Sequence, residues 1–367
     1  MLIDADRHVI EPIDLWKRYL EEPFRAHAPS YEDVGRSGRT PRLMLQGEPV
    51  HHKLSERAVR ELSAVGSRRS DELWAGRDPA AQIRAMDRAH VDMALFFPTT
   101  TLFLLGIDTI DPALAGAFTR AYNRWLHDFC AHDPARLRGV GVVNVHDPAA
   151  MVEDLACIAA WGWTAVVLRP NPVKGRLLSD PAYEPFWAAC ERLDVAVALH
   201  EGAHARVPTA GADRFESRFA LHACSHPMEQ MMAFLALVEG GVLERHPGLR
   251  VAFLEAGCGW LPYWLWRLDE IEYRNLSGEV AENVRRKPSE YFRRQCFVAI
   301  EPDEPYLPEL IPYIGEDNLI FGTDFPHLDH DSDITEKLVP LGQKLPGNVL
   351  QKILRDNPAR LYRLEGV

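Results

Sequence analysis

The chain of 367 residues has few cysteines, and their spacing argues against two common kinds of stabilising site. Its six cysteines are scattered, and no two of them form a C-x-x-C pair. Such pairs are typical of structural zinc sites, and disulfide frameworks need closely spaced cysteines in a short chain. The six thiols are therefore expected to be reduced, as in a cytoplasmic protein.

The chain also lacks an excess of positive charge. Its 41 Lys and Arg residues stand against 53 Asp and Glu residues, and the formal net charge is −12. General binding to nucleic acid or to an anionic membrane requires a basic face, so neither partner is expected. A small anionic substrate stays compatible with this charge, because the local field of a metal cleft can oppose the overall one.

No apolar segment near the amino terminus is long enough for a signal peptide or a membrane span, and the chain opens directly into a predicted strand. Hydrophobic residues make up 47% of the chain, as expected of a soluble protein with a large core. The expected partner is a small-molecule substrate, with no nucleic acid and no membrane. A homo-oligomer is compatible with the sequence.

The first twelve residues contain four side chains that can bind a metal ion: Asp4, Asp6, His8 and Glu11. Alternation along a strand would place Asp4, Asp6 and His8 on one face. Neighbours on one face lie about 7 Å apart, so Asp6 and His8 could hold one ion between them. Taken alone, a solvated acidic strand end explains this segment better, because short D-x-H matches are common.

Three later apolar runs also end at a residue that can bind a metal. The run from Val195 ends at His200, the next at Glu255, and the one from Leu319 at Asp324. A parallel barrel assembles its active site at the carboxyl ends of its strands. These runs therefore predict one shared metal site.

With these motifs the chain resembles the amidohydrolase superfamily, in particular the amidohydrolase-2 branch that includes aminocarboxymuconate semialdehyde decarboxylase and the resorcylate decarboxylases. The resemblance covers nearly the whole chain. It rests on I-D-A-D-R-H-V-I-E-P, A-L-H-E-G, G-V-L-E-R-H-P-G-L-R-V-A-F-L-E-A-G-C-G-W and F-G-T-D-F-P-H.

Periodicity along the chain predicts an α/β fold, a TIM (β/α)8 barrel that forms a single domain over residues 1–367. Residues 91–97, 137–145, 165–169 and 296–300 are predicted strands, besides those that end at the ligands above. Asp78-Pro79 and Asp180-Pro181 predict helix starts. Residues 25–77 are expected to form an insertion that caps the barrel mouth, with two short strands in 42–51 and with His51 and His52 at its surface.

The resemblance implies roles for several residues. His200 matches the family's fifth-strand ligand and His8 the second His of its H-x-H motif, and the eighth-strand Asp324 can also take a proton. Asp6 departs from the pattern, since the decarboxylases place His or Glu there. Glu255 departs as well, because the sixth strand usually presents a histidine.

The residue at position 255 bears on the reaction. Decarboxylation in this branch uses that histidine to handle a proton near neutral pH, and an unshifted carboxyl group does this poorly. His226, His222 or His204 could take its place. The catalytic groups expected are Asp324, Glu255 and His226.

The predicted carboxylate ligands would bring about four negative charges, of which one divalent ion offsets half and two ions offset all. Either one or two of the carboxylates do not touch the metal, or the site is binuclear. Carboxylate-rich ligation favours iron or manganese over zinc, and di-iron oxygen-activating proteins have similar ligands. The predicted metal ligands are Asp6, His8, Glu11, His200, Glu255 and Asp324.

Arg169 ends the predicted fourth strand, where many binuclear amidohydrolases have a lysine. It is either a fork for a substrate carboxylate or phosphate or a partner in a structural ion pair. The apolar run over residues 96–106 either lines the substrate pocket, with Phe97 and Phe103 in contact with substrate, or packs in the core. His327, Asp329 and His330 are candidates for the surroundings of the metal.

Three functions follow from these residues. The lead hypothesis, by a small margin, is a binuclear non-haem iron enzyme that uses dioxygen to hydroxylate a hydrophobic, anionic small molecule, that is, a monooxygenase. The alternative is a metal-dependent hydrolase or carboxy-lyase (decarboxylase), with manganese or zinc as the alternative metals. The third, an inactive barrel that only binds a ligand, is disfavoured by the ligands on strands one, five and eight.

Overall fold

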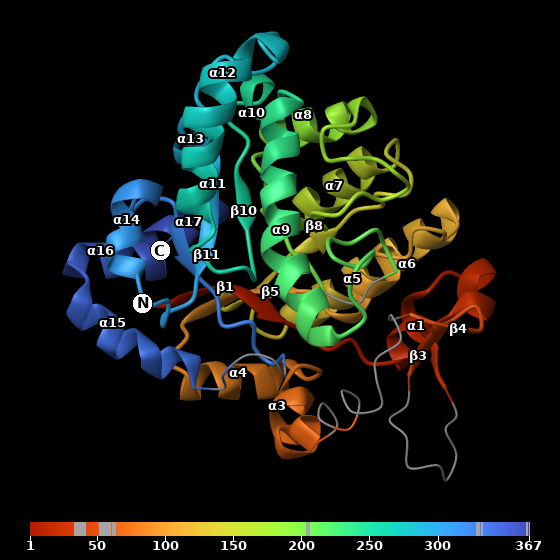
Figure 1. Cartoon of the computed structure of the whole chain (residues 1–367). Helices are drawn as coiled ribbons and strands as arrows, with labels where there is room; N and C mark the ends of the chain where they lie inside the picture. The colour runs from red at the N-terminus through yellow and green to blue at the C-terminus, as the bar shows by residue number, and fades with distance from the viewer. Residues whose placement is uncertain are drawn as a thin grey trace.

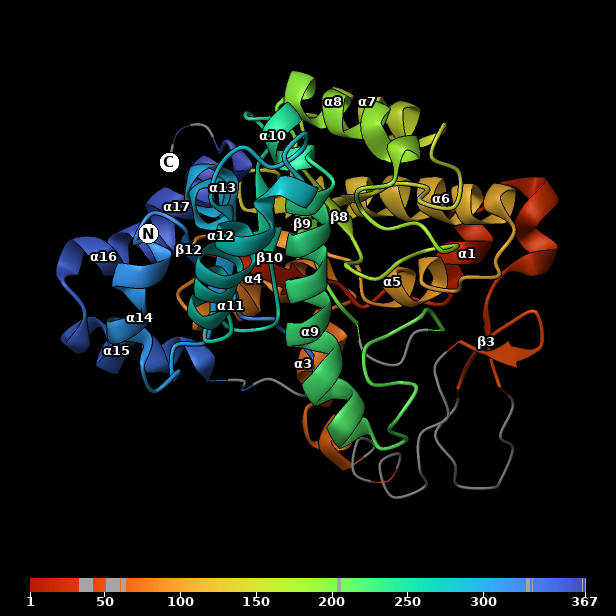
Figure 2. The same ribbon diagram turned by 45° about the horizontal axis from the view of Figure 1, so that its top comes forward.

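The computed structural model describes residues 1–32, 42–50, 60, 64–202, 206–327, 331, 333–364 and 366. Within these ranges, helices surround a ring of parallel strands (Figures 1 and 2). The strands of the ring are β1 (Ile3–His8), β5 (Met93–Phe97), β6 (Leu137–Gly139), β7 (Gly141–Val142), β8 (Ala165–Leu168), β9 (Ala196–Leu199), β10 (Val251–Phe253), β11 (Cys296–Ile300) and β12 (Leu319–Phe321).

The strands pair in two parallel sheets, in the orders β1-β5-β6 and β12-β11-β10-β9-β8-β7. Only Val140 separates β6 from β7, so the two continue as one strand from the first sheet into the second. At the other junction, Asp324 N donates to Asp6 O and His8 N donates to Phe325 O, each over 2.8 Å. The ring is therefore an eight-stranded barrel, and the predicted TIM barrel is confirmed.

The barrel strands are buried along their whole length, which explains their composition. β8 reads Ala-Val-Val-Leu, β9 reads Ala-Val-Ala-Leu, and every residue in both is buried. Strands covered on both faces form nearly continuous apolar runs. Large fully buried side chains then fill the space between the strands and the helices, among them Trp16, Phe118, Trp187, Phe234 and Phe253.

The helices lie outside the strands and follow them along the chain (Figure 2). Asp78 accepts a hydrogen bond from Ala81 N at 2.7 Å, with Pro79 at the first helical position, so the predicted cap is confirmed. The described helices are α1 (Asp14–Tyr19), η1 (Glu22–His27), α3 (Ser70–Ala75), α4 (Pro79–Arg88), α5 (Thr100–Leu105), α6 (Pro112–Cys130), α7 (Met151–Ala160), η2 (Pro181–Tyr183), α8 (Glu184–Leu193), α9 (Arg218–Glu239), α10 (Val242–Arg245), α11 (Leu261–Arg267), η3 (Leu268–Tyr273), α12 (Arg274–Leu276), η4 (Ser277–Glu279), α13 (Pro288–Gln295), α14 (Leu307–Ile314), η5 (Ile334–Lys337), α15 (Leu338–Lys344), α16 (Gly347–Gln351), η6 (Lys352–Asp356) and α17 (Asn357–Tyr362).

Two helices matter for the site. The run over residues 96–106, expected as a pocket wall or core, contains the short helix α5. Helix α9 begins at Arg218, where Ser217 caps it, and it accommodates Pro227 in its interior. His226 therefore lies on this helix. None of the described helices has both the length and the apolar character needed to cross a membrane.

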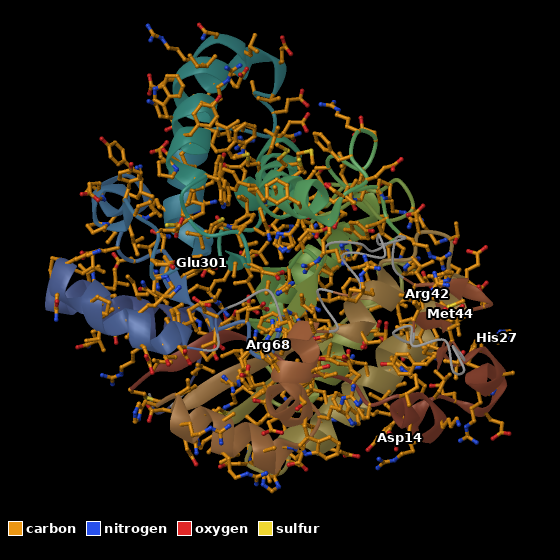
Figure 3. All side chains as sticks on the ribbon, turned by 60° about the horizontal axis from the view of Figure 1, so that its bottom comes forward. Asp14, His27, Arg42, Met44, Arg68 and Glu301 are labelled. Carbon is orange, nitrogen blue, oxygen red and sulfur yellow. The ribbon has the colours of Figure 1, made fainter. Side chains whose placement is uncertain are left out.

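The segment after β1 contains a small antiparallel sheet of β2 (Ser30–Tyr31), β3 (Leu43–Leu45) and β4 (Glu48–Pro49). The two strands expected in 42–51 are thus present, whereas His51 and His52 lie outside the described residues. In Figure 3, His27, Arg42 and Met44 lie at one edge of the molecule, apart from Glu301 at the end of β11. That residues 25–77 cap the barrel mouth stays a prediction.

The cap of α4 can be tested by substitution of Asp78. Asp78→Ala removes the acceptor for Ala81 N and should lower the free energy of unfolding by about 1 kcal/mol, measured by urea denaturation. Asp78→Asn is the control, because an asparagine oxygen can accept the same bond. Equal losses in both variants would contradict a capping role.

Candidate metal centre

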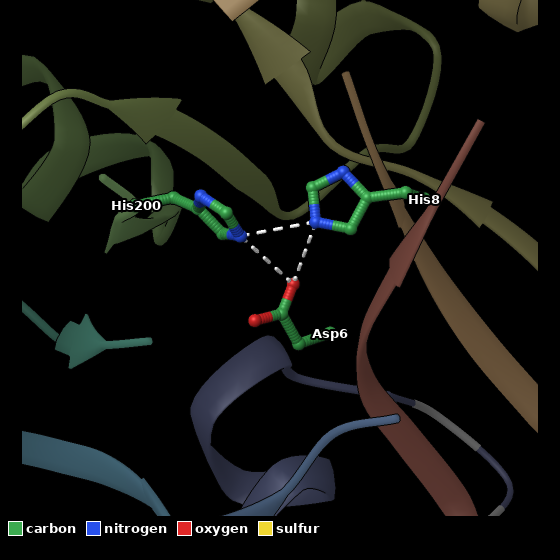
Figure 4. A group of neighbouring side chains, drawn as sticks. All are labelled: Asp6, His8 and His200. Carbon is green, nitrogen blue, oxygen red and sulfur yellow. Dashed lines mark hydrogen bonds and ion pairs between the residues drawn. The ribbon is translucent and has the colours of Figure 1, made fainter. Parts of the chain in front are cut away.

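Five of the six predicted ligands converge at the carboxyl ends of the barrel strands. β1 carries Asp6 and His8, and the residues after β9, β10 and β12 supply His200, Glu255 and Asp324. His8 Nε2 lies 3.0 Å from His200 Nε2 and 3.1 Å from Asp324 Oδ1. Figure 4 shows how Asp6, His8 and His200 point toward one another. The side chains of all five residues are at most 7% exposed, so the cluster is shielded from solvent.

Backbone carbonyls determine which ring nitrogen of each imidazole carries the proton. His8 Nδ1 lies 3.0 Å from Pro98 O, and His200 Nδ1 lies 2.7 Å from Glu201 O. A carbonyl only accepts, so each Nδ1 donates, and each neutral ring then has its lone pair on Nε2. When both rings are neutral, these two lone pairs face each other across 3.0 Å. Such a contact between Nδ1 and a carbonyl is the usual way in which a metal-binding histidine is oriented.

The carboxylates complete a set of donors that a divalent cation fits. Asp6 Oδ1 has no hydrogen-bond partner and lies 3.5 Å from His8 Nε2 and 3.6 Å from His200 Nε2. Unpaired buried carboxylates are costly, and a cation held between them and the imidazoles removes that cost. Three overlapping sets lie close enough to share an ion: Asp6, His8 and His200; His8, Asp324 and His327; His200, Glu255 and Asp324.

Two of these residues have a backbone conformation that is uncommon for side chains other than glycine. Glu255 has φ of +54° and Asp324 has φ of +51°. Left-handed conformations of this kind cost free energy and tend to occur at functional sites, where the surrounding structure holds them. Glu255 lies shortly after the end of β10 and Asp324 shortly after the end of β12, and the turn at each residue aims its side chain into the centre.

The negative charge of the carboxylates dominates the electrostatics of the cluster. Burial by itself would lower the pKa of His8, but the hydrogen bonds and charges of Asp324 and Asp6 raise this pKa well above its usual value. The pKa of His200 is lowered, chiefly by burial. Burial would raise the pKa of Glu255, but the charges of His226 and His200 leave it lowered. The site therefore favours positive charge at its centre.

Glu11, a predicted ligand, is not in this cluster. Its Oε2 accepts from Thr100 N at 2.8 Å and Thr99 N at 3.3 Å, and its Oε1 accepts from Thr101 N at 2.9 Å. These are free amides at the start of α5, where a carboxylate is favourable. The prediction is corrected for this reason: the unexpected helix α5 engages both oxygens of Glu11.

Asp4 also departs from expectation, because β1 is irregular. The register of β1 with β5 shifts between Asp4 and Arg7, so the simple alternation of faces fails. Asp4 accepts hydrogen bonds from the backbone N and the Oγ1 of Thr323, at 2.9 and 2.5 Å. Asp6 and His8 therefore face the metal centre, whereas Asp4 does not.

A histidine lies beside the glutamate that ends the sixth strand of the barrel. His226 Nε2, on α9, is 3.2 Å from Glu255 Oε2, and His226 Nδ1 is 3.0 Å from Ser225 Oγ. The His226 ring stacks on His222 with 4.1 Å between centroids. The predicted catalytic groups Glu255, His226 and Asp324 are therefore near one another, whereas His204 lies outside the described residues.

His327 has a more central place than the sequence indicated. Its Nδ1 lies 2.8 Å from Asp324 Oδ1, its Nε2 lies 2.9 Å from Thr99 Oγ1, and its ring is 4.0 Å from the His8 ring. The three-residue spacing of Asp324 and His327 in F-G-T-D-F-P-H is the signal that could have singled it out. Asp329 and His330, the other candidates there, lie outside the described residues.

The predicted substrate-contacting residues have different environments. Phe97 is fully buried, and its ring centroid lies 5.9 Å from those of His8 and His200, so it packs beside both imidazoles. Phe103 is half-buried. Arg169 Nη2 donates to Glu201 Oε1 and Gly202 O, both at 2.8 Å, whereas its Nε and Nη1 have no hydrogen-bond partner in the described chain.

With this geometry, comparison with known proteins identifies the family. A family model described as amidohydrolase matches residues 3–364. The chain belongs to the amidohydrolase family. Within it, the similarities match the branch of the aminocarboxymuconate semialdehyde and resorcylate decarboxylases that the motifs indicated.

Two relatives and one solved structure illustrate the similarity. The chain is 30% identical over 265 residues to gamma-resorcylate decarboxylase of Rhodococcus jostii. This alignment covers 67% of this chain and 76% of that protein. It is 25% identical over 278 residues to 2-amino-3-carboxymuconate-6-semialdehyde decarboxylase of Dictyostelium discoideum, with coverages of 75% and 71%. A crystal structure of 5-carboxyvanillate decarboxylase of Novosphingobium aromaticivorans contains manganese and 4-hydroxy-3-methoxy-5-nitrobenzoic acid. It aligns with this chain with a TM-score of 0.72 at 18% identity, and the alignment covers 99% of this chain and 96% of that one.

These relatives are decarboxylases, so the predicted dioxygen-dependent di-iron monooxygenase is wrong. The physical source of the error is the count of carboxylates. Glu11 was included among the ligands, but its charge is taken up by the amides at the start of α5. With one carboxylate fewer, the charge argument for a second ion is weaker.

A pair of variants tests the assignment of the two carboxylates. Glu11→Gln should lower the free energy of unfolding by about 2 kcal/mol, because it weakens charged hydrogen bonds to the α5 amides, and should leave the divalent metal content unchanged. Asp6→Asn should instead lose bound metal. Metal analysis and urea denaturation measure both effects. Loss of metal in Glu11→Gln would contradict the capping role.

Proposed function

We propose that this protein is a metal-dependent decarboxylase that releases CO2 from a small aromatic carboxylic acid. The observation that carries the proposal is the buried cluster in which Nε2 of His8 and Nε2 of His200 converge beside the carboxylates of Asp6 and Asp324. The named relatives, which act on carboxylated aromatic or muconate compounds, support the reaction class.

The donor set supports one divalent ion, and manganese in particular. Asp6, His8, His200 and Asp324 would hold it, with two carboxylates and two imidazoles, a harder set than the three histidines that are common for zinc. Manganese is present in the 5-carboxyvanillate decarboxylase complex. The predicted iron and the predicted second ion stay untested. When bound, the ion supplies positive charge that stabilises anionic oxygens of the substrate.

The proton needed for decarboxylation has a natural source on α9. The ring carbon that loses CO2 must gain a proton, and the family usually supplies a histidine from the sixth strand. Here Glu255 takes that position, and His226 Nε2 lies 3.2 Å from its Oε2. We infer that His226 donates the proton, while Glu255 orients the imidazole of His226 and stabilises the protonated imidazole. The loss of the strand histidine is thus compensated from the neighbouring helix.

The substrate is expected to be apolar with at least one anionic group. Phe103 is half-buried beside Gly202, where a Cβ would lie 3.1 Å from Arg169 Nη1, so the glycine leaves room for the guanidinium next to the Phe103 ring. Arg169 stays a proposed substrate ligand. Because Glu201 already neutralises its charge, Arg169 would contribute hydrogen-bond donors and little net charge.

Direct assay of manganese-loaded protein tests the reaction. Incubation with 2,6-dihydroxybenzoate, 5-carboxyvanillate and related hydroxybenzoates should release CO2 from at least one of them, at the same rate with and without oxygen. The CO2 is measured by trapping and the aromatic product by chromatography. Oxygen uptake with a hydroxylated product, or hydrolysis of aryl esters without CO2 release, would contradict the proposal.

Substitution of the proposed proton donor gives a second test. His226→Asn should lower kcat about 100-fold or more, with manganese content unchanged, because the donor is lost and the proposed metal ligands remain. His246→Asn is the matched control. His246 is another buried imidazole, 2.9 Å from Glu184 Oε1 and 3.2 Å from Glu191 Oε2, that lies outside the site. The same fall in kcat for both variants would count against His226 as donor.

A further inference from the structure

The seam between β1 and β12 joins the two segments that carry most of the proposed metal ligands. Asp6 and His8 lie on β1, and Asp324 follows β12. No strand pairing joins β1 to β12 in the described part of the chain. The backbone bonds across the seam run from Asp324 N to Asp6 O and from His8 N to Phe325 O. The spacing of the metal centre therefore depends on these two bonds and on the side chains that hold the seam beside them.

A bulge in β1 turns Asp4 out of the metal centre and into the seam. One extra residue of β1 lies between Asp4 and Arg7 relative to β5, and bulges beside active sites often redirect a side chain in this way. Thr323, on the far side of the seam, donates to Asp4 through both its backbone N and its Oγ1. Arg7 Nη1 donates to Asp4 Oδ2 over 3.2 Å, so this ion pair spans the bulge.

Arg7 extends the same network to the helix outside β1. Its Nε donates to Gln82 Oε1 at 2.8 Å, and Gln82 Nε2 donates to the backbone O of His8 at 3.0 Å. The guanidinium also lies 4.2 Å from the centroid of the Phe325 ring. The side chains of Asp4 and Arg7 are 0% and 1% exposed, and charged hydrogen bonds are strong in such a buried setting.

We propose that Asp4, Arg7 and Thr323 form a positioning clamp that sets the distance between the β1 ligands and Asp324. The clamp rests on the proposed metal centre and adds to it residues that do not touch the ion. Asp4 acts from outside the centre, because both of its oxygens already accept hydrogen bonds. Thr323 directly precedes Asp324, so a shift of Thr323 moves a ligand.

A hydroxyl deletion at Thr323 tests the clamp. Thr323→Val keeps the side-chain shape and the backbone bond but loses the Oγ1 bond to Asp4, and the Kd for Mn2+ should rise about tenfold or more, as when partners behind metal ligands are removed. Thr323→Ser keeps the hydroxyl and should bind Mn2+ with nearly the wild-type Kd. The measurement is titration of chelator-treated protein with Mn2+, with free Mn2+ followed by electron paramagnetic resonance.

Two further variants separate positioning from general stability. Thr119→Val is the matched control, because Thr119 is also buried and its Oγ1 donates to Ala115 O at 3.0 Å, within α6. It should change the thermal unfolding temperature without changing the Kd. Gln82→Met loosens the clamp from α4 and should weaken Mn2+ binding in the same direction as Thr323→Val.

The outcomes distinguish a failure of the clamp from a failure of the metal centre. Equal Mn2+ dissociation constants for wild type, Thr323→Val and Gln82→Met would overturn the clamp alone. Equal weakening in Thr119→Val would also overturn it, because the effect would then be one of general stability. A wild-type protein that binds no Mn2+ would overturn the proposed metal centre and the clamp together.

Discussion

The convergence of two imidazole nitrogens and several carboxylate oxygens at one buried point is the constraint on which the rest of the site depends. Two imidazoles are oriented by backbone carbonyls so that their Nε2 atoms face each other at 3.0 Å, and carboxylate oxygens lie beside them. In a buried setting this arrangement is costly unless positive charge lies between the groups. The charges of Asp324 and Asp6 also raise the pKa of His8, so positive charge, whether a proton or a metal ion, is favoured at this point. The barrel supplies the rigidity that maintains this unfavourable geometry.

The closed barrel explains how residues far apart in the chain come together. Parallel strands present their carboxyl ends at one rim, so ligands on β1 and after β9, β10 and β12 can converge there. The left-handed turns at Glu255 and Asp324 aim two of them inward. The seam between β1 and β12 is where this arrangement depends on side chains as well as backbone, which is why Asp4 and Thr323 lie beside the centre without entering it.

Sequence reasoning predicted the barrel and the residues at its strand ends, because both follow from apolar runs that stop at a polar residue. It misplaced Glu11, since short α5 gives no clear periodic signal and its free amides determine where that carboxylate binds. It misplaced Asp4, since a bulge breaks the alternation on which the prediction relied. For Phe97 a pocket wall and core packing were both open, and the structure shows a fully buried ring. The predicted reaction, hydroxylation by dioxygen, was wrong because the charge of the ligands alone does not determine the reaction.

The most direct test of the central claim is a crystal structure of the protein grown with Mn2+, with anomalous scattering recorded for manganese. We expect one anomalous peak bonded to His8 Nε2, His200 Nε2 and carboxylate oxygens of Asp6 and Asp324. Two peaks at full occupancy, or a peak elsewhere with these four side chains bound only to one another, would contradict it.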